Sequence, residues 1–430
     1  MTTKQITPSD AVLVAIDIAK ARNEVLIEMP GRQRRRKLSI RNTRDDHDRL
    51  VALLLETGRT VICGFEATGN YHRPIAWRLI QAGFDVRLVS SMAAARTREA
   101  LHNSWDKNDP KDAQVILHML GIGATQHYHD PLLVGINDVQ ELSKTHEAIS
   151  RSKTEILHRL LTHYLPLYFP EVERFRQNSR SDWFFAFLVM FPTPASITVM
   201  DEAAFIEAAW HVVGRKVSKA RLLADIYQTA QASIALPIPL DAPAITMFRM
   251  ALAQARSLIR QRDDIEKMAD GMLAPSPDYQ QLRKIPGIGP INALSLIAEA
   301  GDIRRFGHYR QFLKFCGLDL STHQSGVFRG RTKLSKYGNA RLRRTLWVAA
   351  QVAIRQKENS FRDKFERYIA RDRDNPDLRR KALTAITAKM ARVVHAIIKS
   401  GSDYRPFFEG TVPGGRTPLR RAVRAHEATL

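Results

Sequence analysis

Four acidic residues stand where their carboxylates could hold divalent metal ions together. Asp17 lies inside one apolar run and Glu66 ends a second, while Asp109 and Asp112 are three residues apart at an expected helix start. A carboxylate at the end of a buried strand is costly unless it is paired or holds a cation. Paired hard cations about 3.5–4 Å apart, held by carboxylate oxygens, are the usual device for in-line displacement at phosphate. The four acids therefore predict a metal site for phosphodiester chemistry.

Each of these acids also fits an ordinary structural role when it is taken alone. Asp17 fits a turn at a strand end, and Asp109 fits a helix cap before Pro110. Asp106 is a third carboxylate of the same segment and could replace either partner. The joint placement of the acids on the expected elements favours the metal site.

The elements that must position these acids alternate in a recognisable order over residues 1–125. Three strands are followed by a helix, a strand, a helix, a strand and a further helix. This order predicts an α/β domain with a ribonuclease-H-like fold. A doubly wound dinucleotide-binding domain is the rival, but no Gly-x-Gly-x-x-Gly follows the first strand. The expected elements are strands 12–19, 24–29 and 37–41, helix 45–56, strand 60–66, helix 71–82 and strand 85–90.

Residues 126–278 read as an almost wholly helical linker and oligomerisation region. Apolar residues recur at intervals of seven in two stretches, Leu142, Ile149 and Ile156, and later Ile245, Leu252 and Ile259. Such spacing is typical of a coiled-coil hairpin or a dimer stalk. Each stripe covers only about three heptads, so ordinary helix packing is an equal alternative.

The positive charge is concentrated in the last third of the chain. The net charge is +22; residues 301–430 hold 29 Lys and Arg against 11 Asp and Glu, a net +18, which leaves +4 for residues 1–300. A local excess favours a polyanion-binding surface over general solubility. No apolar run reaches membrane-spanning length, and the two cysteines, Cys63 and Cys316, lie in apolar surroundings, so we expect no membrane partner and a reduced, cytosolic compartment.

A second, mostly helical domain is expected over residues 279–409, followed by a mobile basic tail over 410–430. It begins with Ile-Pro-Gly-Ile-Gly-Pro, which has the form of a helix–hairpin–helix turn. Gly287 and Gly289 would let the backbone approach a phosphate closely, beside the N–H groups of the next helix. A tight turn between two helices is the alternative.

The segment between Asp319 and Glu358 contains no acidic residue. Arginines there can make planar, bidentate contacts with phosphates. Ser325 sits within this basic segment, and a serine hydroxyl can attack a phosphodiester. From chemistry alone, Ser325 also fits a turn or cap, and Ser321 and Ser335 are equally eligible. The nine basic residues are Arg329, Arg331, Lys333, Lys336, Arg341, Arg343, Arg344, Arg355 and Lys357.

Together these motifs resemble the DEDD transposases of bacterial insertion sequences, a group of bridge-RNA-guided serine recombinases. The resemblance covers about residues 10–120 and 280–405, and the motifs come in the family's order. The chain departs from the family in extra helical sequence around 165–240. The matching motifs are Ala-Ile-Asp-Ile-Ala-Lys (15–20), Gly-Phe-Glu-Ala-Thr-Gly-Asn-Tyr (64–71), Asn-Asp-Pro-Lys-Asp-Ala (108–113), Ile-Pro-Gly-Ile-Gly-Pro (285–290), Ser-Gly (325–326) and Ser-Lys-Tyr-Gly-Asn-Ala-Arg-Leu-Arg-Arg (335–344).

The resemblance implies a RuvC-like N-terminal domain, a coiled-coil linker and a C-terminal transposase domain. By it, Asp17, Glu66, Asp109 and Asp112 would hold Mg²⁺, with Mn²⁺ as a substitute, and Ser325 would join covalently to DNA. It also implies a composite site between subunits of a dimer or dimer of dimers. Double-stranded DNA of the element ends and target, and a structured guide RNA, would be the partners. The expected location is the bacterial cytoplasm, at the nucleoid.

Two other functions agree with parts of the same pattern. A RuvC-like, structure-specific endonuclease would need the four acids but would use water in place of Ser325. A non-catalytic scaffold for DNA or RNA would need neither the acids nor the metal.

Overall fold

The structure is a computed structural model that describes most of the chain and groups it into two compact units, residues 1–136 and 137–430. Each unit is described by itself. Asp106, Arg331 and the expected tail lie outside the described residues, and the side chains of Asp109, Ser325 and Arg329 are likewise not described. The described residues are 7–31, 34–102, 109–176, 182–213, 218–322, 324–325, 328–330 and 332–405.

The first unit is built on a six-stranded mixed sheet in the order β3-β2-β1-β4-β5-β6. β1 pairs antiparallel with β2 and parallel with β4, which in turn pairs parallel with β5. This is the ribonuclease-H-like arrangement that the sequence predicts, with the short strand β6 added at one edge. The strands are β1 (Val12–Asp17), β2 (Arg22–Glu28), β3 (Arg36–Arg41), β4 (Val61–Glu66), β5 (Asp85–Val89) and β6 (Gln126–His127). The helices are α1 (Arg44–Leu55), α2 (His72–Gln81), α3 (Ser91–His102) and α4 (Asp109–Gly121).

Alternation along the strands gives the sheet two different apolar faces. Even-numbered residues of β1, such as Val14 and Ile16, pack with α1 and α2. Odd-numbered ones, such as Leu13 and Ala15, pack with α3 and α4. In β4 the parity is reversed, so that Ile62 joins the α3 and α4 face. Period-two alternation therefore decides which helix each strand residue meets.

Helix α4 runs antiparallel to β1 across the second of these faces. Its last residue, Gly121, lines the same surface hollow as Ala11 and Leu13 at the start of β1. The Thr7 hydroxyl, just before β1, donates to the Leu120 carbonyl at 2.9 Å. Gly64 allows this close approach, because a Cβ there would lie 2.7 Å from Leu120 Cδ2. The first turn of α4 therefore lies toward the end of the sheet where β1 and β4 finish.

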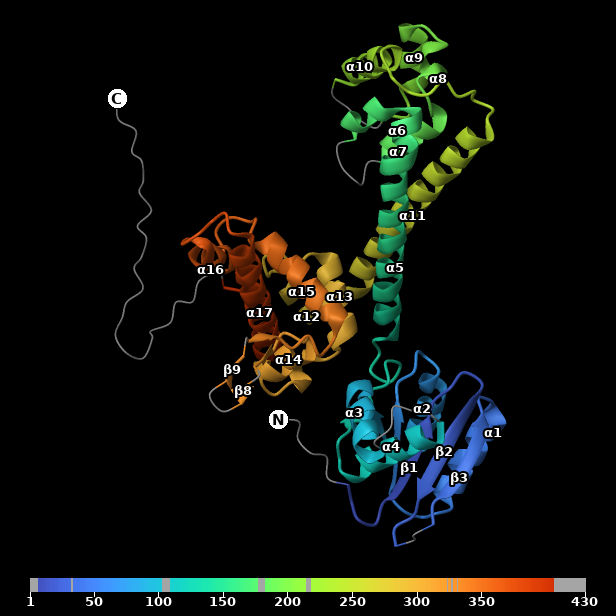
Figure 1. The fold of residues 1–430 in the computed structure, drawn as a ribbon, viewed down its shortest axis with the longest axis vertical. Coiled ribbons are helices and arrows are strands. Elements are labelled where there is room, and N and C mark those ends of the chain that lie inside the picture. The colour runs from blue at the N-terminus through green and yellow to red at the C-terminus, as the bar shows by residue number, and fades with distance from the viewer. Residues whose placement is uncertain are drawn as a thin grey trace. The chain divides into compact units, whose positions relative to one another are not determined.

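The second unit is almost entirely helical and contains two apolar cores joined by a pair of long helices (Figure 1). These helices, α5 (Asn137–Arg159) and α11 (Pro243–Leu273), pack against each other. Ile156 and Ile259 belong to one core, whereas Val139 and Leu273 belong to the other. Ile245, Leu252 and Ile259 are buried as the heptad stripe predicts. Coiled-coil packing between the two helices stays a prediction.

The extra helical sequence forms the first of these two cores. The chain continues from α5 through a π-helical turn, Leu160–Tyr164, into shorter helices that pack around Phe187, Phe205 and Phe248. These helices are α6 (Leu165–Tyr168), α7 (Asp182–Met190), α8 (Ala195–Thr198), α9 (Glu202–Ala209) and α10 (Lys219–Gln231).

The second core holds the C-terminal helices together with the near ends of α5 and α11. It contains Cys316, which is buried, as is Cys63 in the first unit. No helix among the described residues combines the length and apolar character needed to cross a membrane. The helices of this core are α12 (Pro277–Arg283), α13 (Pro290–Ala300), α14 (Tyr309–Phe315), α15 (Ala340–Ala353), α16 (Ser360–Ile369) and α17 (Pro376–Ser400).

Two helices, α12 and α13, flank the glycine turn at the start of this core, as both the helix–hairpin–helix prediction and its alternative of a tight inter-helix turn require. Gly287 is buried with a φ of +88°, and a Cβ there would lie 2.1 Å from the Ala349 carbonyl oxygen. Gly289 is the N-cap of α13, and nothing lies within 4 Å of a Cβ built on it. The first glycine therefore serves close packing on α15, and only the second offers open backbone.

Between α14 and α15 in the chain, the described residues from Asp319 to Ser335 form two short strand pairs, which we call the β-hairpin arm (Figure 1). β7 (Leu320–Ser321) pairs antiparallel with β10 (Lys333–Leu334). Farther out, β8 (Gln324–Ser325) pairs antiparallel with β9 (Phe328–Arg329). Ser325 is therefore carried near the tip of a two-stranded arm, which the sequence did not predict.

The contrast between the two glycines of the turn can be tested by substitution. We expect Gly287→Ala to lower the free energy of unfolding by about 3 kcal/mol or more, because the methyl group meets backbone and φ is unfavourable. The matched variant Gly289→Ala should change it by less than about 1 kcal/mol. Chemical denaturation followed by circular dichroism measures both. Equal effects of the two substitutions would contradict the packing role of Gly287.

Candidate active site

Two of the predicted metal ligands end neighbouring strands on the same face of the sheet. β1 and β4 pair in parallel with Ile16 opposite Phe65, so the next residues, Asp17 and Glu66, lie side by side. Neighbouring strands are about 4.8 Å apart. By the alternation of both strands, the two side chains point to the face that α3 and α4 cover. The sheet thus brings together two acids that are far apart in the sequence.

A further carboxylate continues this row. In the antiparallel pairing of β1 with β2, Glu24 lies opposite Asp17. Its side chain is one-quarter exposed and lies 3.9 Å from Lys37 Nζ. Periodicity predicts that Glu24 begins a strand but not that it lies beside Asp17, because the register of an antiparallel pair depends on the turn that joins the strands.

The third acid, Asp112, comes from the first part of α4 on the same face. It is buried, and its Oδ1 accepts a hydrogen bond of 2.7 Å from Arg98 Nε on α3. The side chains of Asp112 and Arg98 are only 10% and 16% exposed. A carboxylate this buried requires a cation, and here the guanidinium supplies it. Asp109 begins the same helix, one turn earlier.

Among the side chains that the structure describes, no three His, Cys, Asp or Glu groups are close enough to hold one metal ion. The donor set nevertheless suits a hard divalent cation, because it consists of carboxylate oxygens directed to one face at one end of the sheet. One of these carboxylates, that of Asp112, forms an ion pair with Arg98. Both contacts of Arg98 are with Oδ1 of Asp112, so this ion pair leaves Oδ2 for another partner.

The end of β4 is supported from the opposite face by an aromatic cluster. The ring of Phe65 lies 5.4 Å from that of His72 and 5.5 Å from that of Tyr128. Burial lowers the pKa of His72, which keeps this imidazole neutral at physiological pH. Burial, together with the nearby Asp130 carboxylate, raises the pKa of Tyr128 to about 12. Neutral rings thus fix the strand end that carries Glu66.

The base of the hairpin arm is fixed by two glycines in close contact. A Cβ on Gly338 would lie 2.5 Å from the Gly317 nitrogen, and both glycines have positive φ angles. Arg343 donates to the Cys316 and Lys336 carbonyls at 3.2 and 3.1 Å, across the same junction. The two chain segments that enter and leave the arm are therefore held against each other.

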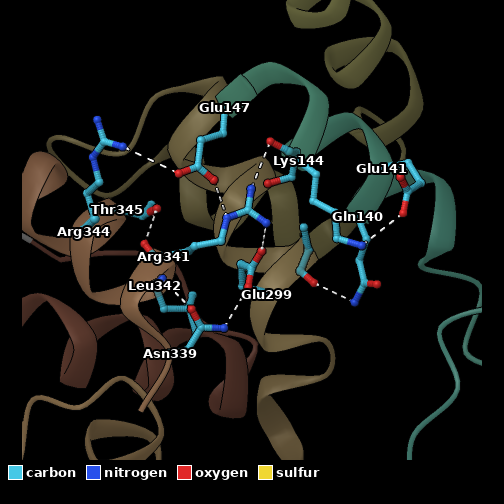
Figure 2. A network of polar contacts seen from close by, with 12 residues as sticks. Gln140, Glu141, Lys144, Glu147, Glu299, Asn339, Arg341, Leu342, Arg344 and Thr345 are labelled. Atoms are coloured by element: carbon cyan, nitrogen blue, oxygen red, sulfur yellow. Dashed lines mark hydrogen bonds and ion pairs between the residues drawn. The ribbon is translucent and has the colours of Figure 1, made fainter. Parts of the chain in front are cut away.

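Arg341 connects α15 to two other helices through ion pairs (Figure 2). Its Nε lies 2.6 Å from Glu147 on α5, and its Nη1 bonds Glu299 on α13. Asn339, the N-cap of α15, donates to the second oxygen of Glu299 at 2.7 Å. Glu299 is only 14% exposed on its side chain. This network sets the start of α15, where the arm returns to the core.

These contacts divide the basic residues that the sequence proposed for nucleic-acid binding. Arg341 and Arg343 are engaged inside the protein. Lys333 and Lys336 are exposed. Arg344 is 74% exposed, and its ion pair with Glu147 is long, at 3.7 Å. The exposed cations are thus the ones available to a polyanion.

Two family models match the chain over the regions that carry these features. A model of DEDD transposases of the IS110 type, described as Transposase, matches residues 14–170. A second model, described as the Transposase IS116/IS110/IS902 family, matches residues 279–366. The first range contains all four predicted metal ligands, and the second contains the glycine turn and the arm with Ser325.

The chain belongs to the DEDD transposase family of insertion sequences.

Curated relatives of this family member cover different shares of it. The transposase for insertion sequence element IS1111A of Coxiella burnetii is 31% identical over 33% of the chain and 38% of its own length. A Pseudomonas aeruginosa protein named as a family 20 transposase is 30% identical over 40% of the chain and 50% of its own length. A mini-circle protein of Streptomyces coelicolor, named for IS117, is 25% identical over 73% and 78%. The chain thus spans half or less of the first two relatives.

Among the solved structures that match is the RuvC protein of T. thermophilus in complex with a Holliday junction substrate. It is 10% identical, with a TM-score of 0.21, over 27% of the chain and 99% of RuvC. The ribonuclease-H-like fold of the first unit is assigned from the strand order of its sheet and not from this match.

Several residues that position the site were missed by sequence reasoning. Arg98, Glu147 and Glu299 are ordinary charged residues of helices, and nothing in their local sequence indicates a partner. Their partners lie 14, 194 and 42 residues away along the chain. Only the packing of the helices reveals such pairs.

Substitution of Arg98 tests whether this residue serves as the counter-cation of Asp112. We expect Arg98→Gln to lower the free energy of unfolding by about 2–4 kcal/mol without divalent metal, because a buried carboxylate loses its partner. Added Mg²⁺ should raise the melting temperature more in this variant than in the wild type, because the carboxylate is then open to the ion.

The matched control is Arg44→Gln, which breaks an exposed pair with Asp48 in the same unit. It should cost less than about 1 kcal/mol and leave the Mg²⁺ response unchanged. Thermal unfolding with and without Mg²⁺ measures both variants. If Arg98→Gln behaves like the control, Arg98 does not hold Asp112.

Arg341 and Arg344 form a second pair of matched variants. Arg341→Gln should lower the free energy of unfolding by about 2 kcal/mol, because Glu299 keeps its charge in a nearly buried position. Arg344→Gln should change it by less than about 0.5 kcal/mol, since its ion pair is exposed. Urea denaturation distinguishes the two. Equal stabilities would show that the Arg341 network does not fix α15.

Proposed function

We propose that the protein is an insertion-sequence transposase that cuts and rejoins DNA with a metal-binding acidic quartet and a serine nucleophile. The observation that carries this proposal is the placement of Asp17 and Glu66 side by side, on the sheet face that also receives the start of α4 with Asp112. Family membership supports an enzyme that acts on DNA.

In this proposal Asp17, Glu66, Asp109 and Asp112 bind Mg²⁺, for which Mn²⁺ can substitute. The bound ions would supply charge stabilisation at the scissile phosphate. The carboxylates themselves fix the position of that charge, because two of them are held by paired strands and a third by a packed helix. Such a rigid donor set is what binding at a defined point requires.

Ser325 is proposed as the nucleophile because of its Ser-Gly context in the basic arm. Its Oγ forms a bond to the scissile phosphorus as the bond to one sugar oxygen breaks, and the proton lost by the serine is balanced by one gained by the leaving oxygen. The number of phosphoester bonds is unchanged, so attack by a sugar hydroxyl of another strand can reverse the step and join new ends. Arg329, Arg331 and Lys333 would balance the charge on the phosphate.

The partners of this reaction are proposed on the family resemblance. They are double-stranded DNA of the element ends and target, a structured guide RNA, and further copies of the chain in a dimer or dimer of dimers. The acids of one copy would then face the serine of another. Lys336, Arg344 and the open backbone at Gly289 are the groups we assign to nucleic-acid contact, since they are accessible.

A trapping experiment tests the nucleophile. Wild-type protein incubated with labelled element-end DNA, guide RNA and Mg²⁺ should give a covalent adduct on a denaturing gel, and Ser325→Ala should lose it completely. The control Ser321→Ala, four residues earlier in the arm, should keep the adduct. Asp17→Asn and Glu66→Gln should reduce its formation by at least about a hundredfold.

Each alternative has its own outcome in the same assay. A RuvC-like endonuclease that uses water would still cleave DNA in the Ser325→Ala variant and would give no adduct in any variant. A non-catalytic scaffold would be unaffected by Asp17→Asn. An adduct that persists in Ser325→Ala would place the nucleophile elsewhere.

A further inference from the structure

Helices α16 and α17 pack together and carry four cations on neighbouring positions, which we call the α16/α17 basic face. Its members are Lys364 and Arg367 on α16, and Lys389 and Arg392 on α17. Arg367 and Arg392 are exposed, whereas the two lysines are half-buried. Within the described part of the chain, none of the four forms an ion pair with a carboxylate. The face lies largely outside the segments matched by the family models, which end at residue 366.

Aromatic rings support three of these cations. Lys389 Nζ lies 5.0 Å from the centre of the Phe361 ring, and Arg392 lies 6.0 Å from that of Tyr309. Lys364 Nζ lies 5.9 Å from the ring of Tyr368, which is itself 43% exposed. Cation–π contacts orient these groups without neutralising their charge. The face therefore combines fixed positive charge with an accessible aromatic ring.

Mutual repulsion makes this arrangement unfavourable without an anion. Burial, followed by the cations of Lys364 and Arg367, lowers the pKa of Lys389 to about 8. Asp363 opposes this shift, and Arg392 adds a smaller effect in the same direction as burial. Burial and the neighbouring arginines also lower the pKa of Lys364. Lys389 donates hydrogen bonds to the carbonyl and hydroxyl of Ser360 at 2.7 and 2.8 Å, which hold its ammonium group in place.

Several other basic residues of the same unit are paired. Arg304 bonds Asp278 at 2.6 Å, and Lys284 bonds Asp403 at 2.7 Å. Arg380 pairs with Asp377 three residues away. These three cations thus have acids as partners, while the α16/α17 basic face gathers four cations that form no ion pair within 4 Å among the described residues, with Asp363 the acid that acts on Lys389.

We propose that the α16/α17 basic face binds the phosphodiester backbone of a nucleic acid, as a contact area additional to the arm. A phosphate backbone offers regularly spaced charges that match a row of fixed cations, and arginines can bind its oxygens in pairs. The exposed tyrosine suits stacking or packing beside a sugar. The inference rests on the proposed function only in requiring that the protein acts on nucleic acid.

Binding measurements on a charge-neutralised variant test this proposal. The variant combines Lys364→Gln, Arg367→Gln and Arg392→Gln, and its matched control combines Lys284→Gln, Arg304→Gln and Arg380→Gln, with the same loss of charge. Both are made in full-length protein carrying Asp17→Asn, so that cleavage does not interfere. The probes are a 30-base-pair duplex DNA and an RNA hairpin with the same number of phosphates.

We expect the variant to bind at least about tenfold more weakly than the control at 0.15 M salt. For duplex DNA, the slope of log affinity against log salt should fall in magnitude by about 2.7, or about 0.9 for each lost contact. Weakening with both probes supports the shared backbone chemistry, and weakening with one identifies that nucleic acid as the partner. Equal affinity and slope for variant and control overturn the proposal.

Two further results distinguish nucleic-acid binding by this face from membrane binding and from the proposed strand cleavage. If the variant loses binding to vesicles of anionic lipid but keeps its affinity for both nucleic acids, the face serves a membrane and the proposal is wrong. Binding is measured without strand cleavage, so a missing Ser325 adduct would count against the proposed function alone. An affinity and salt slope equal to those of the control would count against the basic face alone.

Lys389 provides a second readout that a merely structural lysine would not give. A bound phosphate should raise its pKa from about 8, so the complex should take up a proton when it forms near pH 8.5. Calorimetry in two buffers of different ionisation enthalpy measures this uptake. Lys389→Arg keeps the charge but cannot titrate there, and should therefore take up fewer protons, by up to about three-quarters of a proton for each protein bound. Identical uptake in both proteins would contradict a phosphate at Lys389.

Discussion

In the first unit, neighbouring buried strands end in carboxylates, and these negative charges require a cation close by. Asp17 and Glu66 lie side by side because β1 and β4 are paired in parallel, and Asp112 faces the same side because α4 crosses it in the opposite direction. Like charges at such spacing repel one another unless a cation lies among them. Arg98 supplies one positive charge to Asp112 from α3. The same requirement explains why this end of the sheet suits a divalent metal, and why neutral aromatic rings support the opposite face.

In the second unit, close backbone contacts restrict the base of the arm that carries Ser325. Gly317 and Gly338 bring the two segments at its base into backbone contact, and Arg343 bonds carbonyls of both. Arg341 then ties the returning segment to α5 and α13 through Glu147 and Glu299. Conformational freedom is thus removed at the base of the arm, which is what a nucleophile near its tip would need to be placed reproducibly. The long helix α5 shares this network, so its position and that of the arm are coupled.

Periodicity was sufficient to predict the strands and helices around the acids, because each has one apolar face and a clear end. The order of these elements predicted the arrangement of the sheet, and the motif Ile-Pro-Gly-Ile-Gly-Pro predicted a turn between two helices at Gly287 and Gly289. It could not separate the two glycines, because one packs on a helix more than sixty residues away. Arg341 and Arg343 looked like nucleic-acid ligands from charge alone, yet both have internal partners. The β-hairpin arm was missed because its strands are only two residues long and carry no alternation that a sequence could reveal.

Binding of Mn²⁺ followed by electron paramagnetic resonance tests the central claim most directly, since it reports the ion without any nucleic acid. We expect the wild type to bind Mn²⁺ and both Asp17→Asn and Glu66→Gln to weaken this binding by at least about tenfold. Glu28→Gln, which alters an exposed carboxylate on β2 paired with Arg35, should bind as the wild type does. If Asp17→Asn and Glu66→Gln also retain wild-type affinity, the acids at the strand ends do not form a metal site.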